Sequence, residues 1–467
     1  RVPDAMSATR HGSREHPPPS QPTLLERALR VFSDVRAGEG TLLLLMTLNV
    51  FVVMVGYYVL KTVREPLILA SGGETALPFP VSGSEGKAYA ASAQALCLVL
   101  ASSVYARLAA HWSVRRLIHR VILFFVACLL LFYAAAHAGL PHLGFVFYVW
   151  VGVFNVAVIA QFWAFANDVY PRSSGERIFP VIMLGMGLGG WLGSKLAAGL
   201  YRLGVGSFEM MLVAAALLLL HVALYVAVHR VRERGGVPAP RDSHPEPAPF
   251  SMRGAFALLA ESRYLKLIAA MLIAANLVNT TGEYLLSVAV KQAAEGAADE
   301  RAFIGAFYGD FHAHVNLGVL VVQGLLTSRL VRHGGITAVV FALPLVALGA
   351  YSLIAVGATF AIIRWAKVAE NTADYSIMGT AKALLFLPTT REEKYKAKVA
   401  IDTVFVRLGD VLASGLVALG LHVFTLSTRG FALVNVAVIA VWLLLALGIA
   451  RRYRALSAER ERFSNPP

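Results

Sequence analysis

Long apolar stretches recur along most of the chain, separated by short polar or charged loops. Each is at least about 20 residues long, which at 1.5 Å of helical rise per residue crosses the roughly 30 Å of hydrocarbon in a bilayer. The pattern therefore predicts twelve membrane-spanning helices. Their expected ranges are 41–70, 88–109, 117–137, 143–167, 178–201, 208–228, 264–290, 303–328, 335–356, 358–387, 396–424 and 430–450.

A polar stretch rich in Pro, Gly and charge interrupts this pattern after the sixth apolar segment. It begins at residue 230 and reads RVRERGGVPAPRDSHPEPAPF, a composition typical of a flexible linker. The loops after the fourth and tenth segments also echo each other, reading YPRSSGER at 170–177 and LPTTREEK at 387–394. Two parallel six-helix repeats around a cavity resemble the major facilitator superfamily. We therefore expect an all-α membrane protein with twelve transmembrane helices in two six-helix pseudo-repeats.

Arginine and lysine are concentrated in alternate loops, including the linker and the segment after the last span. The positive-inside rule then predicts that both termini and the linker are cytoplasmic, as in a bacterial inner membrane. Residues 1–22 are polar and Pro-rich, so no signal peptide is expected there. Apolar residues at 25–35 share one helical face, which suits an interfacial helix or an ordinary connector. The expected boundaries are a cytoplasmic tail and interfacial helix at 1–38, a six-helix bundle at 39–229, a cytoplasmic linker at 230–251, a second six-helix bundle at 252–452, and a cytoplasmic tail at 453–467.

Composition supports a membrane protein. Mean hydropathy is +0.64, and charged residues make up 15% of the chain, against about 25% in soluble domains. The formal net charge of +14 fits cytoplasmic loops, so the lipid bilayer is an expected partner and nucleic acid is not. Cys97 and Cys128 lie in apolar segments and suggest neither a disulfide nor a metal site. The sequence contains no GxSxG, HExxH or Cys/His cluster, so neither an enzyme nor a cofactor is expected.

The first apolar segment carries charges near its end, where the sequence reads LKTVREPL from residue 60. On a continuous helix Lys61 shares a face with Arg64 and Glu65. Charged groups at membrane depth are costly, and they line water-filled cavities or pair with one another. We therefore expect Lys61 and Arg64 to bind substrate and Glu65 to take part in gating or coupling. A helix that ends at Leu60, with these charges at the outer interface, is the alternative.

The tenth expected span bears a single polar stripe. At helical spacing it contains Arg364, Lys367, Glu370, Asn371 and Asp374. We expect Arg364 and Lys367 to contact substrate, and Glu370 and Asp374 to take part in gating or coupling. A ladder of ion pairs that holds this helix to a neighbour is the alternative.

Charges continue through the following loop and span. Lys382 lies in the apolar run that ends at Pro388, and Asp402 and Arg407 lie within the next apolar helix. Lys382 is a further candidate for substrate binding, while Asp402 and Arg407 are candidates for gating or coupling.

Three other spans carry polar groups at membrane depth. They are Lys195 in the fifth, Asn279 and Glu283 in the seventh, and Asp310, His312 and His314 in the eighth. The first three are candidate substrate contacts. The last three are candidates for gating or coupling and could relay protons, because imidazole titrates near neutral pH. Two histidines at i and i+2 diverge on a helix, which excludes a shared metal ion; hydrogen-bonded packing is the alternative to a relay.

Glycines in the fifth expected span form a seam. Gly185, Gly189 and Gly193 share one helical face, and small residues at this spacing let membrane helices approach closely. The motif lacks the Lys-Ser/Thr of a phosphate-binding loop. We therefore expect helix packing rather than ligand binding there.

Four segments resemble the ATP/ADP translocases, the nucleotide transporter family of plastids and obligate intracellular bacteria. They are LKTVREPLI at 60–68, FWAFAN at 162–167, FYGDF at 307–311, and a block at 382–410 in which Pro388, Glu393, Lys396, Lys398, Ala400, Ile401, Asp402, Arg407 and Gly409 are in register. The resemblance covers roughly residues 36–425 and implies a major-facilitator-like fold.

The resemblance also implies a function, since that family exchanges ATP for ADP or imports nucleotides through a cationic cavity. Arg64 and Lys382 match its basic substrate-contacting positions. Two acids of the family are replaced: the one in the fourth span by Val151, with Asn155 nearby, and the one in the seventh span by Asn279. Glu283 lies one helical turn beyond that second position.

We therefore expect a transporter, acting as a monomer, that moves nucleotides by alternating access through a cationic central cavity. A proton-coupled transporter of another organic anion or solute, using Asp310, its neighbouring histidines and Glu283, is the alternative. Uptake that follows a pH gradient without a counter-substrate would distinguish the two. A membrane scaffold is expected to carry a soluble partner-binding domain, which the linker and tails do not supply.

Overall fold

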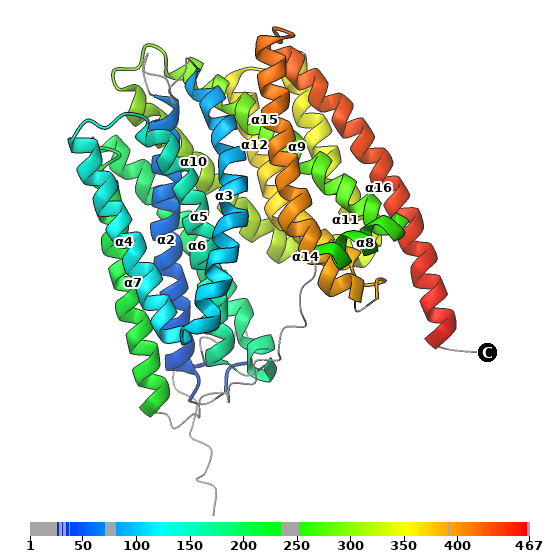
Figure 1. Cartoon of the computed structure of the whole chain (residues 1–467), viewed down its shortest axis with the longest axis horizontal. Coiled ribbons are helices and arrows are strands. Elements are labelled where there is room, and N and C mark those ends of the chain that lie inside the picture. The colour runs from blue at the N-terminus through cyan, green and yellow to red at the C-terminus, as the bar shows by residue number, and fades with distance from the viewer. Residues whose placement is uncertain are drawn as a thin grey trace, which may run out of the picture.

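A computed structural model describes residues 26–27, 30, 34–36, 38–70, 81–170, 172–234, 252–390 and 392–464. This part of the chain is almost entirely helical and contains no strand (Figure 1). Most of the expected N-terminal tail with its interfacial helix, and most of the expected linker, lie outside the described residues.

Two groups of helices stand side by side in Figure 1. The first bundle contains α2 (Gly40–Leu69), α3 (Gly83–His111), α4 (Val114–His137), α5 (Leu143–Val169), α6 (Arg172–Arg202) and α7 (Glu209–Arg234). The second bundle contains α8 (Met252–Glu261), α9 (Arg263–Ala294), α10 (Glu300–Val321), α11 (Ser328–Ala355), α12 (Phe360–Ala373), α13 (Gly379–Leu385), α14 (Lys398–Ala400), α15 (Val406–His422) and α16 (Thr428–Ser464). Four π-helical segments interrupt it, η1 (Val322–Thr327), η2 (Asp374–Met378), η3 (Glu393–Ala397) and η4 (Ile401–Phe405).

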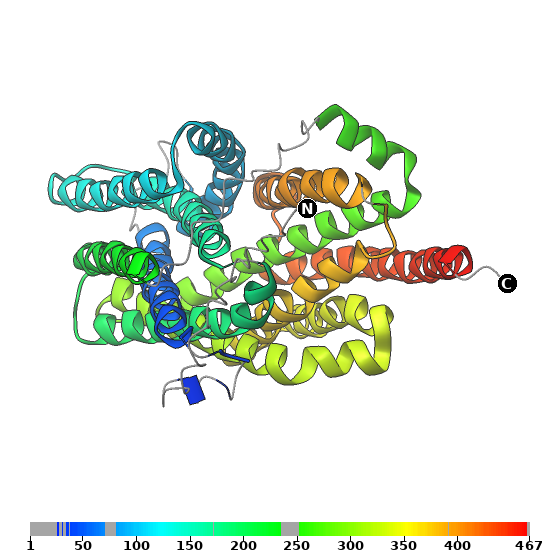
Figure 2. The ribbon, with the colours of Figure 1, turned by 90° about the horizontal axis from the view of Figure 1, so that it is seen from below.

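Each bundle has its own apolar core. One core lies within α2–α7, and the other lies mainly within α9–α16 and extends into α2, α3 and α5 where the bundles touch. Figure 2, turned by 90°, shows α2–α7 (blue to green) gathered on one side, with α15 and α16 (orange and red) on the other. A substrate site between two separately packed bundles can therefore change shape when one bundle moves relative to the other.

Within the described residues, nine helical stretches are long and apolar enough to cross a membrane. One of them, Glu300–Ala355, holds both α10 and α11. The nine do not include α3 or the α12–α13 segment. The α12–α13 segment carries the polar stripe, and the charged residues of the stripe lower the mean hydropathy of the segment. Two of these residues, Lys367 and Glu370, are nevertheless buried within the protein. The chain is a multi-pass integral membrane protein.

The glycine seam packs as the sequence predicts. A Cβ atom built at Gly185, Gly189 or Gly193 would contact α2, and at Gly193 it would lie 2.6 Å from the Val55 oxygen and 2.7 Å from the Val55 Cα. Because these are backbone atoms, they cannot move aside as a flexible side chain could. The seam therefore sets how closely α6 approaches α2.

Gly193→Ala should destabilise the protein by roughly 1–3 kcal/mol, the usual cost of adding a methyl group to a closely packed contact. Thermal unfolding of purified protein in detergent would measure it. Gly199→Ala is the matched control on the same helix, since a Cβ there would meet no atom within 4 Å. Equal unfolding temperatures for the two variants would contradict the seam.

Candidate functional site

A polar cavity of about 340 Å³ lies between the two bundles. Its walls come from α2, α3 and α5 of the first bundle and from α9, α10, α12, η2 and α15 of the second. The polar and charged side chains that line it are Tyr57, Tyr58, Lys61, Arg64, Glu65, Gln94, Tyr148, Asn155, Asn276, Asn279, Thr280, Glu283, His312, Asn316, Asn371, Asp374, Tyr375, Arg407 and Asp410. Helices from both halves of the sequence thus contribute to one site.

Two further spaces adjoin this polar chamber. An apolar chamber of about 590 Å³ shares Tyr57, Tyr58, Lys61, Asn155, Asn316 and Tyr375 with it, and is otherwise lined mainly by Met, Leu, Ile, Val and Pro side chains of α2, α5, α6 and α10. A small pocket of about 30 Å³ shares Asn276, Asn279 and Asp374, and holds Lys382. The site therefore joins a polar space to an apolar one, with tyrosines at the boundary.

Lys61 lies at that boundary because α2 continues through the charged motif to Leu69. Its Nζ lies 5.2 Å from the centroid of the Tyr58 ring and 5.4 Å from that of Tyr375. Aromatic faces attract a cation through their quadrupole. Among the described residues, no carboxylate forms an ion pair with Lys61, so its charge is available to an anionic substrate.

Arg64 is more fully engaged. Its Nε lies 3.0 Å from Glu65 Oε1, and its guanidinium carbon lies 4.2 Å from the centroid of the Tyr148 ring. The neighbouring carboxylate offsets the charge of Arg64 but leaves the guanidinium with further N–H donors. Arg64 can therefore still donate hydrogen bonds to a phosphate, although Glu65 offsets part of its charge.

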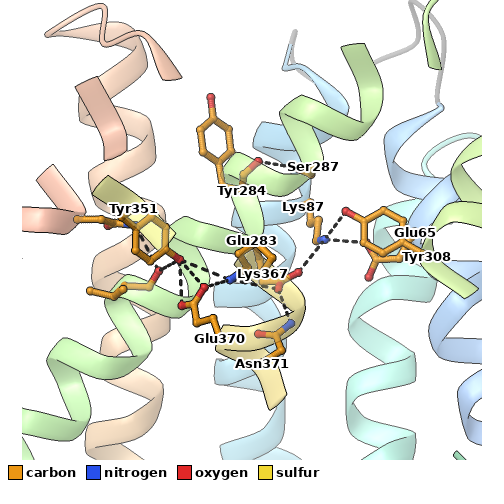
Figure 3. Close-up of polar contacts among 12 residues, drawn as sticks. Glu65, Lys87, Glu283, Tyr284, Ser287, Tyr308, Tyr351, Lys367, Glu370 and Asn371 are labelled. Carbon is orange, nitrogen blue, oxygen red and sulfur yellow. Dashed lines mark hydrogen bonds and ion pairs between the residues drawn. The ribbon is translucent and has the colours of Figure 1, made fainter. Parts of the chain in front are cut away.

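A buried chain of alternating charges runs from this motif into the second bundle (Figure 3). Lys87 Nζ lies 2.8 Å from Glu65 Oε2 and 3.4 Å from Glu283 Oε2. Lys367 Nζ lies 3.6 Å from Glu283 Oε1 and 2.7 Å from Glu370 Oε2. Tyr308 accepts a hydrogen bond from Lys87, Tyr351 donates to Glu370, and Asn371 donates to Glu283. Alternation lets each buried charge keep a partner, which offsets its desolvation.

Lys87 was not among the residues predicted for the site. The expected second span began at residue 88, whereas α3 begins at Gly83. The signal for the earlier start is a Ser-x-x-Glu pattern, in which the Ser82 side chain accepts a hydrogen bond from the Glu85 backbone N–H. Such a pattern marks a helix N-terminus. It places Lys87 within the helix, where the residue is only 3% exposed.

The ion pairs that join the two bundles cluster at one end of the molecule. This distal end is opposite the C-termini of α7 and α16, which mark the linker end (Figure 1). The pairs are Lys87 with Glu283, and Lys195 and Arg202 with Asp310; His422 Nε2 also lies 2.6 Å from Glu85 Oε1. No ion pair joins the bundles at the linker end within the described part of the chain. Among the described residues, the ion pairs between the bundles therefore hold them together at the distal end.

Asp310, His312 and His314 do not come together. Asp310 pairs with Lys195 and Arg202, while His312 is buried on the cavity wall with its Nε2 unpartnered among the described residues. His314 Nδ1 is 2.5 Å from the Asp310 backbone oxygen, and its ring packs on Trp365. His312, two residues from each of the others, lies on a different face of α10, and among the described residues no hydrogen bond joins the side chains of these three groups.

Other predicted site residues lie outside the polar chamber. Arg364 packs on the rings of Phe307 and Trp365, and Asp402 is exposed. Lys367 and Glu370 lie in the buried charge chain behind Glu283 rather than on the cavity wall. Lys367 and Glu370 of the polar stripe thus belong to an ion-pair network, whereas Asn371 and Asp374 of the same stripe line the cavity.

The lining is mixed in charge, whereas the sequence led us to expect a cationic cavity. Its basic side chains are Lys61, Arg64 and Arg407, and its acidic ones are Glu65, Glu283, Asp374 and Asp410. Asp410 accepts a hydrogen bond from Thr280 at 2.8 Å and pairs with Arg407 at 3.3 Å. Hydropathy and helical spacing predicted the basic side chains of the lining, but they did not predict which carboxylates pair with them.

Comparison with a protein family and comparison with individual proteins give the same result. Residues 144–453 match the family described as TLC ATP/ADP transporter. ADP,ATP carrier protein 1 of Chlamydia trachomatis serovar D is 27% identical, over 66% of this chain and 64% of that protein. ADP,ATP carrier protein 1 of Chlamydia muridarum is 25% identical over 89% of both chains. The chloroplastic ADP,ATP carrier protein 1 of Arabidopsis thaliana is 24% identical, over 66% of this chain and 53% of that protein.

Solved structures show the fold. The nucleoside transporter NupG superposes with a TM-score of 0.63 at 13% identity, covering 88% of this chain and 99% of that one. An auto-inhibited peptide transporter of the POT family gives a TM-score of 0.59 at 12% identity, covering 89% and 97%. The chain therefore shares the fold of these membrane transporters.

Proposed function

Because the chain belongs to the TLC ATP/ADP transporter family, we propose that it carries nucleotides across a membrane through the cavity between its two bundles. The family consists of transporters, so the protein is not an enzyme. The relatives that it matches are named as carriers of ADP and ATP, which makes adenine nucleotides the first substrates to test.

The joined polar and apolar chambers carry this proposal. A nucleotide has a charged phosphate end and a flat, weakly polar base, and the cavity offers a matching division. Lys61 faces the phosphate in the polar chamber, with Arg64 and Lys382 in reach as further donors. The base lies against Tyr57, Tyr58 or Tyr375 at the edge of the apolar chamber, where aromatic rings stack favourably.

The placement of the ion pairs between the bundles supports alternating access. With the distal end closed by pairs between the bundles, the substrate enters from the linker end. Rocking one bundle against the other breaks the pairs at the distal end and opens the cavity there. In this proposal Lys87, Glu283 and Asp310 form a gate at the distal end, and Glu65 couples that gate to Lys61 and Arg64 on the same helix.

We propose twelve spans in two halves, with both termini and the linker cytoplasmic. Each of the twelve apolar segments coincides with a helix or an interrupted run of helices. The loops at the linker end carry most of the basic residues, and such loops are cytoplasmic by the positive-inside rule. The distal end therefore faces away from the cytoplasm. The cavity is complete within one chain, which is consistent with a monomer.

Single cysteines should report this orientation. In a variant lacking Cys97 and Cys128, a cysteine replacing Leu140, exposed between α4 and α5, should react with an impermeant maleimide added outside intact cells. A cysteine replacing Ala458, exposed near the end of α16, should react only after the cells are opened. Reaction of both from the same side would contradict the proposed topology.

Transport by purified protein in liposomes tests the function itself. Labelled ATP, ADP and AMP should enter liposomes that contain the protein, and protein-free liposomes supply the background. Faster uptake into vesicles preloaded with unlabelled nucleotide would indicate exchange. If no nucleotide enters under any condition, the proposal fails; uptake of another organic anion that follows an imposed pH gradient would then support the proton-coupled alternative.

A further inference from the structure

We propose that Asn155 distinguishes adenine from guanine nucleotides by hydrogen-bonding to the edge of the base that carries N6 and N7. This inference rests on the proposed nucleotide transport and specifies which residue of the same site reads the base. It comes from the position of one amide side chain, at the boundary of the polar and apolar chambers, whose oxygen is buried without a hydrogen-bond donor.

Asn155 lies where the face of α5 that borders the site changes from polar to apolar. Tyr148, Gly152 and Asn155 line the polar chamber, whereas Asn155 and Ile159 line the apolar one. These four residues follow one another at intervals of three or four positions, so they share one face of the helix. A base that stacks on the tyrosines of this boundary keeps its polar edge free, and Asn155 belongs to the same boundary.

The amide of Asn155 is available to a ligand. Its oxygen is buried and accepts no hydrogen bond among the described residues. The other amide at this boundary is engaged, since Asn316 Nδ2 donates to the His312 backbone oxygen at 2.9 Å. Gln94 and Asn279 also have buried oxygens without a donor, but they line the polar chamber and not the apolar one. A buried amide oxygen without a donor costs free energy, and a substrate that supplies the donor removes that cost.

Adenine and guanine differ at the edge that such an amide reads. Adenine offers its N6 amino group as a donor and N7 as an acceptor, and an asparagine side chain pairs with both at once. Guanine offers two acceptors there, O6 and N7. The same side chain can then donate to only one of them, and its own oxygen is left without a donor. Guanine nucleotides therefore bind more weakly than adenine nucleotides with the same number of phosphates.

Competition binding on the purified full-length chain tests the contact, with ATP, GTP and 7-deaza-ATP as competitors. 7-deaza-ATP carries a C–H group in place of N7 and keeps the N6 amino group and the phosphates. ATP should bind about tenfold more tightly than GTP and at least about fivefold more tightly than 7-deaza-ATP. Binding of either competitor as tight as that of ATP would overturn the inference while leaving nucleotide transport intact. A failure of every nucleotide to bind would overturn both.

Asn155→Leu assigns the contact to this residue. Leucine is similar in size and has no polar atom, so the preference for ATP over both competitors should fall below about threefold. Gln292→Leu is the matched control, since it removes an exposed amide on α9 outside the cavity, and it should keep the wild-type preference. Asn155→Ser, whose hydroxyl is too short to span two atoms of the base, should behave as Asn155→Leu does and replaces it if the leucine variant fails to fold. A wild-type preference in either folded variant would overturn the role of Asn155.

Discussion

Lys87→Gln should cost roughly 3–5 kcal/mol of stability, because it removes one partner from a buried ion-pair network and leaves carboxylates unpaired. Lys87 is almost fully buried, contacts Glu65 and Glu283 from opposite sides, and donates a hydrogen bond to Tyr308. Glutamine is shorter and uncharged, so it cannot replace these contacts. Thermal unfolding in detergent would measure the loss.

The same change should also weaken the contact between the bundles at the distal end. Lys87 belongs to the first bundle and Glu283 to the second, so their pair holds the bundles together there. A cysteine replacing Gln94, on the cavity wall, should then react faster with a maleimide added from the distal side. Unaltered reactivity, with transport as in wild type, would contradict a gate at this position.

A double-mutant cycle separates the pair from its surroundings. If Lys87 and Glu283 interact directly, Lys87→Gln combined with Glu283→Gln should be less destabilised than the sum of the single variants, by an interaction energy of about 0.5–3 kcal/mol. Lys266→Gln combined with Glu283→Gln is the control, and its effects should be additive. Lys266 is exposed on α9 and has no ion pair among the described residues. Additive effects of the two substitutions would argue that each residue acts through other partners.

The regular features of the fold could be predicted from the sequence because they have local causes. Apolar length determines where a helix can cross the membrane, and the spacing of Gly185, Gly189 and Gly193 is enough to predict close packing. Charged groups at membrane depth also predicted the cavity, because a charged side chain buried there without water or a partner costs too much free energy. Lys61, Arg64 and Glu283 on the cavity wall were found in this way.

The pairing of those groups could not be predicted. Asp310 is 115 residues from Lys195 along the chain, and nothing local distinguishes a carboxylate that pairs with a cation of the other bundle from one that relays protons. The π-helical segment η2 adds a second obstacle, because it shifts the register between Lys367 and Lys382 relative to a regular helix. Spacing along the polar stripe also did not separate Asp374, on the cavity wall, from Arg364, which packs against aromatic rings.

Lys61→Gln should weaken the binding of phosphorylated substrates by about ten- to a hundredfold, since a hydrogen bond to a charged group contributes roughly 1.5–3 kcal/mol. Transport at limiting substrate should fall in proportion. Lys61→Arg should retain more activity than Lys61→Gln, because a guanidinium keeps the charge and also stacks on Tyr58 and Tyr375. Uptake and binding assays on the same preparations would measure both effects.

Adenosine provides the internal control for this prediction. It lacks the phosphate and can still place its base against the tyrosines, so its binding should change by less than about threefold in Lys61→Gln. An equal loss for adenosine and AMP would mean that Lys61 shapes the cavity rather than binds phosphate.

Arg64→Gln should weaken the binding of adenosine and AMP more equally than Lys61→Gln does. Removing Arg64 also leaves Glu65 without one of its partners and disturbs the ion-pair network that continues to Lys87. If Lys61→Gln took up nucleotide as wild type does, the phosphate would have to bind elsewhere, with Lys382 and Arg407 the next cations to test.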